Sequence, residues 1–231
     1  MKIPSVLKNL IDDIFLLYIN ISNSFYNFFW FIVEIIKFYK NPKLRKIDIE
    51  LFKIYSIRDQ FTIANEYKEN NQNLDDLTYG EATWYSIDKA IKFIKIENCR
   101  NFLELGCGIG RISFFMNIKY NLNSIGVDLI PEFINNANKI IDKFNLKNIK
   151  FINENWFNIN FSFADIVFIA ATCLDNKTLK LLKEKFDNEL KSNSYILSVS
   201  FPFETKKIKK ITTLNLPFSW GRADLYILKK L

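Results

Sequence analysis

A cluster of glycines after a short apolar run is the first feature of this sequence that could do chemistry. Gly106, Gly108 and Gly110 follow the strand-length run 102–105, and an apolar helical pattern begins at Ile112. This order predicts a strand, a glycine loop and the start of a helix. Glycine lets the backbone pass close to a ligand, and the free N–H groups that open a helix favour a negatively polarised group. We therefore predict that this loop holds a cofactor.

An acid lies where a nucleotide ribose would bind beside such a loop. Asp128 ends the next apolar run and follows Glu104 by 24 positions. That spacing is close to the one at which a carboxylate accepts hydrogen bonds from ribose hydroxyls in doubly wound folds. A nicotinamide dinucleotide site would need the pattern Gly-x-Gly-x-x-Gly, but Arg111 stands where its last glycine should be. The pattern here is Gly-x-Gly-x-Gly, so a nicotinamide site is not indicated.

The absence of histidine narrows the chemistry further. The 231 residues include no histidine and only three cysteines, none of them in a Cys-x-x-Cys pair. Ser-His-Asp triads, histidine-ligated metals, zinc knuckles and disulfide frameworks are therefore not indicated. We expect a site without a metal, in a reducing compartment.

The elements that must position these residues alternate regularly between strand and helix. This alternation predicts an α/β fold of the doubly wound, Rossmann-like class, with a mostly parallel seven-stranded sheet and an antiparallel closing strand. Ligands of such sheets bind beyond the carboxyl ends of the strands. The expected strands are 102–105, 124–128, 149–153, 164–170, 195–199, 207–213 and 224–228, and the expected helices are 83–96, 112–118, 131–144 and 175–190.

The N-terminal part is expected to be helical and separate from this domain. Residues 14–33 carry no charge and are long enough for a membrane span, but polar residues interrupt the run. One interpretation is an amphipathic helix that packs on the domain or on a partner. The other is a membrane-bound or interfacial helix at 10–40, since Lys37, Lys40, Lys43, Arg45 and Lys46 follow and would keep the remaining chain cytoplasmic, at the inner face of a membrane.

A polar stretch separates the two parts. Residues 69–76 form the best candidate linker, so we expect a helical segment with linker at 1–76 and a catalytic domain at 77–231. The net charge of +7 suits simple solubility, and also an anionic membrane, RNA or an acidic protein. The basic run 206–210 is either an RNA contact or a solvated strand edge.

Two of these motifs resemble those of a known family. Glu104-Leu-Gly-Cys-Gly-Ile-Gly110 is similar to the first motif of class I S-adenosylmethionine-dependent methyltransferases, and Gly126-Val-Asp128 to the second. The resemblance implies that Glu104 and the glycine loop hold the methionine part, that Asp128 binds the ribose, and that Asn155 and Trp156 contact adenine. The cofactor-binding residues it implies are Tyr79, Glu81, Glu104, Leu105, Gly106, Cys107, Gly108, Gly110, Asp128, Leu129, Asn155, Trp156 and Ala170.

Further motifs narrow the resemblance towards lysine methylation. Tyr79-Gly80-Glu81 and Ser219-Trp220 resemble the seven-stranded, non-SET histone-lysine methyltransferases, and the hydrophobic N-terminal segment resembles that of membrane-associated lysine methyltransferases. Ala170 and Ala171 depart from the paired asparagines usual after the fourth strand in the histone enzymes. The resemblance implies Tyr79, Glu81 and Trp220 as catalytic candidates. An acceptor lysine must arrive neutral, and Tyr79, Trp84, Phe201 and Trp220 are candidate walls for the apolar pocket that would promote this.

We therefore expect an S-adenosylmethionine-dependent methyltransferase whose favoured acceptor is a protein lysine. An RNA or small-molecule methyltransferase on the same fold and a non-catalytic, membrane-tethered cofactor-binding protein are the alternatives. Cytosine C5 methyltransferases use a cysteine after the fourth strand, but Thr172 precedes Cys173 where those enzymes have proline. We expect Cys173 to be a buried small side chain. The sequence makes no prediction of the oligomeric state.

Overall fold

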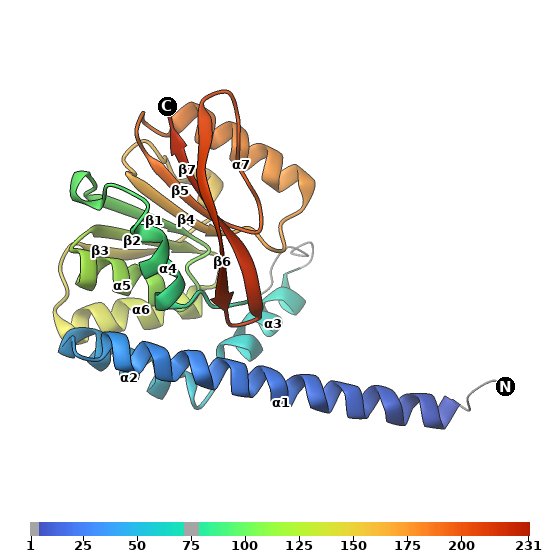
Figure 1. Ribbon diagram of the computed structural model, residues 1–231. Coiled ribbons are helices and arrows are strands. Elements are labelled where there is room, and N and C mark those ends of the chain that lie inside the picture. The colour runs from blue at the N-terminus through green and yellow to red at the C-terminus, as the bar shows by residue number, and fades with distance from the viewer. Residues whose placement is uncertain (1–4, 72–78) are drawn as a thin grey trace.

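The computed structural model describes residues 5–71 and 79–231, with side chains described from Ser22 onward. Seven strands form one sheet in the order β3-β2-β1-β4-β5-β7-β6 (Figure 1). β7 is antiparallel to β5 and to β6, and the other pairs are parallel. The expected fold class is confirmed. The strands are β1 Asn101–Leu105, β2 Asn123–Asp128, β3 Ile149–Asn153, β4 Ile166–Ala170, β5 Tyr195–Val199, β6 Ile208–Phe218 and β7 Gly221–Lys230.

Helices cover both faces of the sheet. Successive residues of β1 show why, because Phe102 packs in the core with α4 and α5, whereas Leu103 packs in the core with α7 on the other face. The fully buried parallel strands are accordingly apolar on both sides. The helices are α4 Trp84–Ile91, α5 Arg111–Tyr120, α6 Pro131–Phe144 and α7 Asn176–Glu189, with short 3₁₀ turns at Ile96–Asn98 and Trp156–Asn158.

Local signals explain several helix boundaries. α6 begins at Pro131, whose fixed φ suits a first turn, and buries Phe133, Ile134, Ala137 and Ile140 on one stripe. Other helices begin after a side chain that accepts a hydrogen bond from the first turn, which supplies a partner for an otherwise unpaired N–H group. These capping residues are Asn41, Asp59, Thr83 and Asp175.

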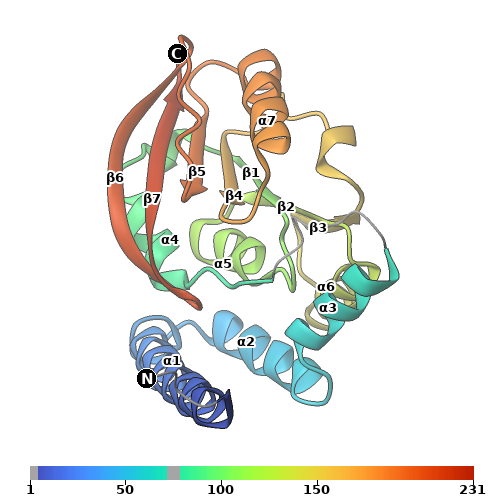
Figure 2. The same ribbon diagram turned by 90° about the vertical axis from the view of Figure 1, so that its right-hand side faces the viewer.

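The N-terminal helices form a further layer beneath the domain (Figure 2). Phe38 of α1 lies edge-on to the rings of Trp84 and Phe115, with centroids 6.0 and 5.2 Å away. α2 buries Leu44, Ile47 and Leu51 on the side that faces the domain. One face of this helical layer is therefore part of the core. The layer consists of α1 Ser5–Phe38, α2 Pro42–Tyr55 and α3 Gln60–Asn70.

Several expected boundaries were wrong. The helix expected at 83–96 ends at Ile91, because the N–H groups of Phe93 and Ile94 bond to the carbonyls three residues back, which tightens and closes the last turn. Of the expected linker at 69–76, Glu69 and Asn70 belong to α3, and 72–76 lie outside the described residues.

The closing strand pair is longer than expected. β6 and β7 have 11 and 10 residues and pair from Ile208 with Lys230 to Phe218 with Gly221. Pro217 is tolerated because β6 lies at the edge of the sheet. In the ranges 5–71 and 79–231, no helix combines the length and the apolar character that a membrane crossing requires.

Candidate functional site

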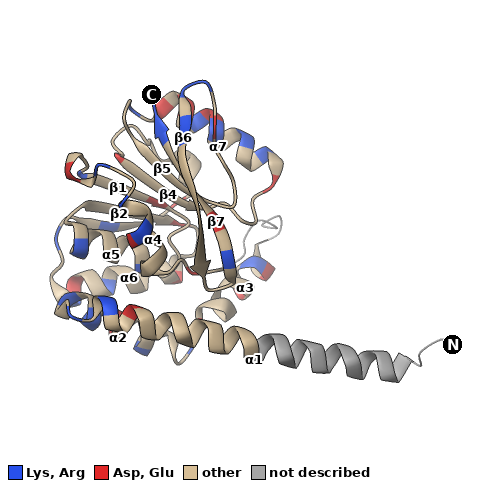
Figure 3. Ribbon diagram, viewed as in Figure 1, with Lys and Arg blue, Asp and Glu red and all other residues tan. Residues whose placement is uncertain are grey.

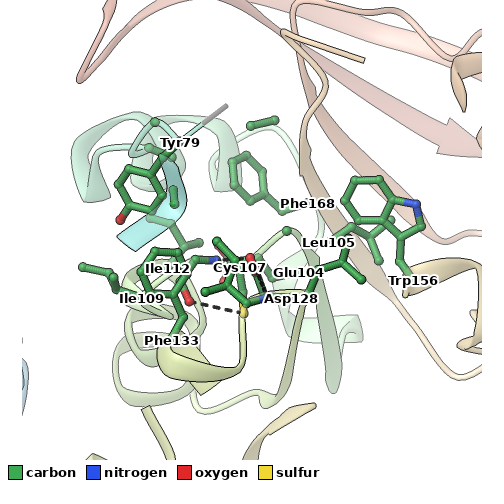
Figure 4. A pocket seen from close by; sticks show the side chains of 18 of the residues that line it. Tyr79, Glu104, Leu105, Cys107, Ile109, Ile112, Asp128, Phe133, Trp156 and Phe168 are labelled. Carbon is green, nitrogen blue, oxygen red and sulfur yellow. Dashed lines mark hydrogen bonds between the residues drawn. The ribbon is translucent and has the colours of Figure 1, made fainter. Parts of the chain in front are cut away.

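A cavity of about 430 Å³ opens at the carboxyl ends of β1, β2 and β4. Such volumes are typical of small-molecule sites, and ligands of open α/β sheets bind at this end. Figure 4 shows Tyr79 and Trp156 on opposite sides of the cavity, with Glu104 and Asp128 between them. The apolar wall is made by Leu105, Ile109, Ile112, Ile130, Phe133, Phe157, Phe168 and Leu174.

The glycine loop connects β1 to α5 and lines the cavity floor. Gly106, Gly108 and Gly110 have φ angles of 70°, 51° and 80°, which residues with a Cβ rarely adopt. A Cβ on Gly108 would lie 2.9 Å from Cε2 of Tyr79, so this ring closes over the loop. A Cβ on Gly110 would lie 2.5 Å from the ring of Phe151. Gly110 does not line the cavity, and its role is to let α5 begin against β3.

Asp128 lies at the carboxyl end of β2 and orders the loop across from it. Its Oδ2 accepts a hydrogen bond from the Gly108 N–H at 2.7 Å, and its Oδ1 accepts one from the Ile130 N–H at 2.9 Å. Burial raises the pKa of Asp128, and these backbone donors oppose that rise. A carboxylate has lone pairs beyond these two bonds, so Asp128 can also accept hydrogen bonds from hydroxyl groups of a ligand.

Glu104 lines the cavity although it is a buried residue of a central strand. The hydroxyl group of Ser113 in α5 donates a hydrogen bond to Oε2 of Glu104 at 2.5 Å. Burial raises the pKa of Glu104 to about 8, and Ser113 lowers it in part. A carboxyl group in this setting retains its proton in the free protein and can ionise beside a cationic ligand.

The proton on Glu104 predicts a dependence of stability on pH. The folded pKa of about 8 lies above the ordinary glutamate pKa of 4.5, so the folded state holds a proton that the unfolded state has lost between these two pH values. The contribution of this proton to the free energy of unfolding is complete below the unfolded pKa and is lost as pH rises through the folded pKa. Relative to Glu104→Gln, the wild-type protein should lose roughly 3–5 kcal/mol of unfolding free energy between about pH 5 and pH 8. Urea unfolding at several pH values measures this, and equal pH slopes in both proteins would contradict it.

Tyr79 and Glu81 form a hydrogen-bonded pair above the glycine loop. The Tyr79 hydroxyl donates to Oε1 of Glu81 at 2.8 Å, and Nε2 of Gln60 in α3 donates to the same oxygen at 3.0 Å. Burial is the main cause that raises the pKa of Glu81, while Arg111 and Tyr79 lower it. The backbone of Glu81 is bound to Ser219 in the turn between β6 and β7. Tyr79 and Gln60 therefore hold the carboxyl group of Glu81, and Ser219 holds its backbone.

Most of the residues expected at the site line the cavity. They are Tyr79, Glu81, Glu104, Leu105, Gly106, Cys107, Gly108, Asp128, Leu129, Asn155, Trp156 and Ala170, so Gly110 is the exception. The Asn155 Oδ1 accepts from the Phe157 N–H at 2.9 Å and caps a 3₁₀ turn. Burial raises the pKa of Cys107 well above its usual value, so this thiol is protonated and unreactive.

Three expected walls and one expected buried cysteine lie elsewhere. Trp220 does not line the cavity, because its ring stacks on Phe218 with centroids 5.0 Å apart and covers Gly80. Trp84 is fully buried in the core, and Phe201 packs in the core beside α7. Cys173 was expected to be buried but is exposed, since it lies in the loop between the carboxyl end of β4 and α7.

The N-terminal helices contribute residues to the site that sequence patterns did not reveal. Ala64 of α3 lines the cavity, and Gln60 bonds to Glu81. Phe61 of the same helix packs edge-on against Tyr79, with ring centroids 5.2 Å apart. α3 therefore supports the Tyr79 and Glu81 pair, although it precedes the domain in sequence.

Arg111 joins the same helices to the start of α5. Its guanidinium donates to Glu34 of α1 at 2.8 Å and to Asp48 of α2 at 2.7 Å. The guanidinium carbon also lies 4.3 Å from the ring centroid of Trp84. The residue that breaks the dinucleotide pattern is thus the bridge between the glycine loop and the N-terminal layer.

Comparisons with known proteins agree with this geometry. Residues 96–223, more than half of the chain, match the family described as methyltransferase domain. No curated protein sequence matches the chain significantly.

Similar solved structures share the fold at low sequence identity. An RNA methyltransferase from Salinibacter ruber, solved with S-adenosyl-L-homocysteine, is 18% identical with a TM-score of 0.53, over 63% of this chain and 90% of that one. TrmN from Thermus thermophilus is 11% identical with a TM-score of 0.54, over 69% and 52%. A protein from Pyrococcus horikoshii OT3 is 13% identical with a TM-score of 0.52, over 64% and 91%.

The cavity suits the cofactor of this family. S-adenosylmethionine carries a cationic amino-acid part, a ribose with two hydroxyls and a flat base. The cavity supplies carboxyl groups at Glu104 and Asp128, backbone approach at the glycine loop and an aromatic surface at Trp156. With the match over residues 96–223, the chain belongs to the methyltransferase domain family and is a class I S-adenosylmethionine-dependent methyltransferase.

Proposed function

We propose that this enzyme methylates the side-chain amine of a protein lysine. The observation that carries the proposal is the buried carboxyl group of Glu81, which lines the cavity and is bound by Tyr79 and Gln60. A lysine must lose a proton before its nitrogen can attack a methyl group. A carboxylate whose pKa is raised by burial is a better proton acceptor than an ordinary surface glutamate.

The charge of the cavity supports a cationic acceptor. Its acidic lining residues besides the protonated Glu104 are Glu81, Asp128, Glu154 and Asp175, whereas Arg111 is the one basic residue among the described lining residues. The guanidinium of Arg111 is bound to Glu34 and Asp48. An acidic cavity attracts an ammonium group and opposes entry of a phosphate.

We assign the cofactor to the loop and the acids around it. In this assignment Asp128 binds the ribose hydroxyls. Glu104 and the glycine loop bind the methionine part, and Asn155 and Trp156 contact the adenine. Asn155 uses its Oδ1 to cap a turn, so its amide nitrogen is the group to contact the base. Tyr79, whose ring lies against Gly108, is to cover the bound cofactor.

The cofactor supplies an activated methyl group on a sulfonium, so the protein need not generate an electrophile. Its remaining tasks are to align the acceptor nitrogen, exclude water and accept one proton. Apolar side chains at Phe168 and Leu174 line the cavity and disfavour the charged form of an entering amine. In this proposal Glu81 accepts the proton that the amine releases.

RNA is the second candidate acceptor. One of the similar structures favours it, since the Salinibacter ruber protein is an RNA methyltransferase. The basic run 206–210 does not add support at the site. Lys209 pairs with Lys229 of β7, and Lys229 pairs with Tyr195, the first residue of β5. The run therefore lies at the amino end of the parallel strands, opposite the end that carries the cavity.

Glu81→Gln tests the proposed role directly. We expect the turnover number to fall about a hundredfold, because the amide cannot accept the proton, while cofactor affinity changes little. Glu97→Gln is the matched control, since Glu97 lies in the 3₁₀ turn before β1, far from the cavity. Single-turnover rates with labelled cofactor measure the effect. A wild-type rate in the Gln variant would contradict a role for Glu81 as proton acceptor.

The acceptor class is tested by transfer of labelled methyl groups in a cell lysate. Label in material that protease removes, and that yields methylated lysine on hydrolysis, supports the proposal. Label removed by ribonuclease would assign RNA instead, and label only in small metabolites would assign a small molecule. Tight cofactor binding without transfer to any fraction would identify a non-catalytic binding protein.

A further inference from the structure

The side of α1 that points away from the domain is apolar although it faces solvent. Tyr26, Trp30, Glu34 and Phe38 share one side of the helix and point to the domain, where Trp30 contacts Tyr85 with ring centroids 4.9 Å apart. The opposite side carries a stripe at helical spacing. Its members are Phe25, Phe28, Ile32 and Ile36, which are 71%, 62%, 37% and 69% exposed. A solvated helix normally places polar residues on this side.

α2 continues this surface with cations. It buries Leu44, Ile47 and Leu51 against the domain and leaves a mixed outer side. α1 and α2 lie beneath the domain in one layer, so their outer sides face away from it together (Figure 2). We call the following exposed residues the outer face: Phe25, Phe28, Phe29, Ile32, Ile36, Arg45, Lys46, Ile49, Phe52 and Lys53.

The exposed charges where α1 meets α2 have one sign. Between Ser22 and Ile47 the only acid is Glu34, which is buried and bound to Arg111 (Figure 3). Lys40, Lys43, Arg45 and Lys46 are all exposed in the same segment. A second copy of the chain would bring the same cations together without acids to pair with them. An anionic surface complements both the cations and the apolar stripe.

We propose that the outer face binds the surface of an anionic lipid bilayer, with α1 lying in the plane of the interface. Aromatic and aliphatic side chains on one side of a helix, with cations beside them, are the combination that inserts between lipid headgroups. α1 lies on the bilayer and does not cross it, because its inner side is bound to the domain through Glu34 and Arg111. The proposal does not depend on the identity of the methyl acceptor.

Vesicle flotation of the full chain tests the proposal. Vesicles of phosphatidylcholine with about 30 mol% phosphatidylserine should bind the protein at least about tenfold more tightly than pure phosphatidylcholine. Phe25→Asn with Phe28→Asn should weaken binding more than about tenfold to both kinds of vesicle. Arg45→Glu with Lys46→Glu should remove the preference for the anionic vesicles and leave the weak binding to neutral vesicles unchanged.

Matched controls come from elsewhere on the surface. Phe93→Asn with Leu181→Asn removes exposed apolar side chains outside the outer face, and Lys206→Glu with Lys207→Glu reverses exposed cations at the far sheet edge. These variants should bind vesicles like the wild type. Circular dichroism and cofactor calorimetry verify that every variant is folded.

Three results would overturn the proposal. They are absence of binding to anionic vesicles, an equal loss of binding in the control variants, and a vesicle-free dimer that Phe25→Asn with Phe28→Asn dissociates in sedimentation equilibrium. The last result would assign the outer face to a second copy of the chain.

Discussion

Asp128→Ala is expected to abolish measurable cofactor binding in calorimetry, with affinity at least about a hundredfold lower. The substitution removes the acceptor for the ribose hydroxyls, and each hydrogen bond to a charged group contributes about 1.5–3 kcal/mol. It also leaves the Gly108 and Ile130 N–H groups without the carboxylate that now binds them at 2.7 and 2.9 Å. The glycine loop therefore loses its order together with its ligand contact.

Asp165 provides a matched control for this prediction. Its Oδ2 also accepts hydrogen bonds from two backbone N–H groups, those of Arg100 and Asn101, both at 2.8 Å. It directly precedes β4, at the amino end of the strands and therefore opposite the cavity. Asp165→Ala should lower stability but leave cofactor affinity unchanged. Full affinity in the Asp128 variant would refute the proposed ribose site.

Arg111→Met is expected to lower the free energy of unfolding by about 3–5 kcal/mol, because it leaves two buried carboxylates without their partner. The side chains of Glu34 and Asp48 are 4% and 7% exposed. Urea unfolding followed by circular dichroism measures the loss. The triple variant Arg111→Met, Glu34→Gln, Asp48→Asn should recover most of it, since no unpaired charge remains.

An exposed arginine gives the comparison. Arg58 also bridges two acids, Glu66 and Glu132, but its side chain is 44% exposed. Arg58→Met should lower the free energy of unfolding far less than Arg111→Met, because water screens and replaces these ion pairs. A similar loss in both variants would show that burial of the Arg111 cluster contributes nothing to its strength.

Local signals predicted the fold and the glycine loop well. The glycine positions, the acid at the end of β2 and the stripe of α6 are all read within about 15 residues, and each reflects a short-range requirement of backbone or burial. The mostly parallel pairing followed because a strand-helix-strand connection joins parallel strands, whereas the order of the strands was not predicted.

Long-range contacts account for what the sequence did not predict. Arg111 is 77 positions from Glu34, and Gln60 is 21 positions from Glu81, with no periodicity linking either pair. Trp220 was expected in the cavity, but its place depends on how the turn between β6 and β7 lies over Gly80. The extra length of β6 and β7 arises because each strand supplies the hydrogen-bonding partner of the other.

The position of α3 has a consequence for how this enzyme is divided into parts. The family match begins at residue 96, after Ala64, Tyr79 and Glu81 have all been contributed to the cavity. A recombinant fragment cut at the family boundaries would keep the glycine loop but would lose most of β7, together with the residues before 96 that form one wall and the cover of the cavity. The smallest active unit of this enzyme is therefore larger than its recognisable domain, and it starts within the N-terminal helices.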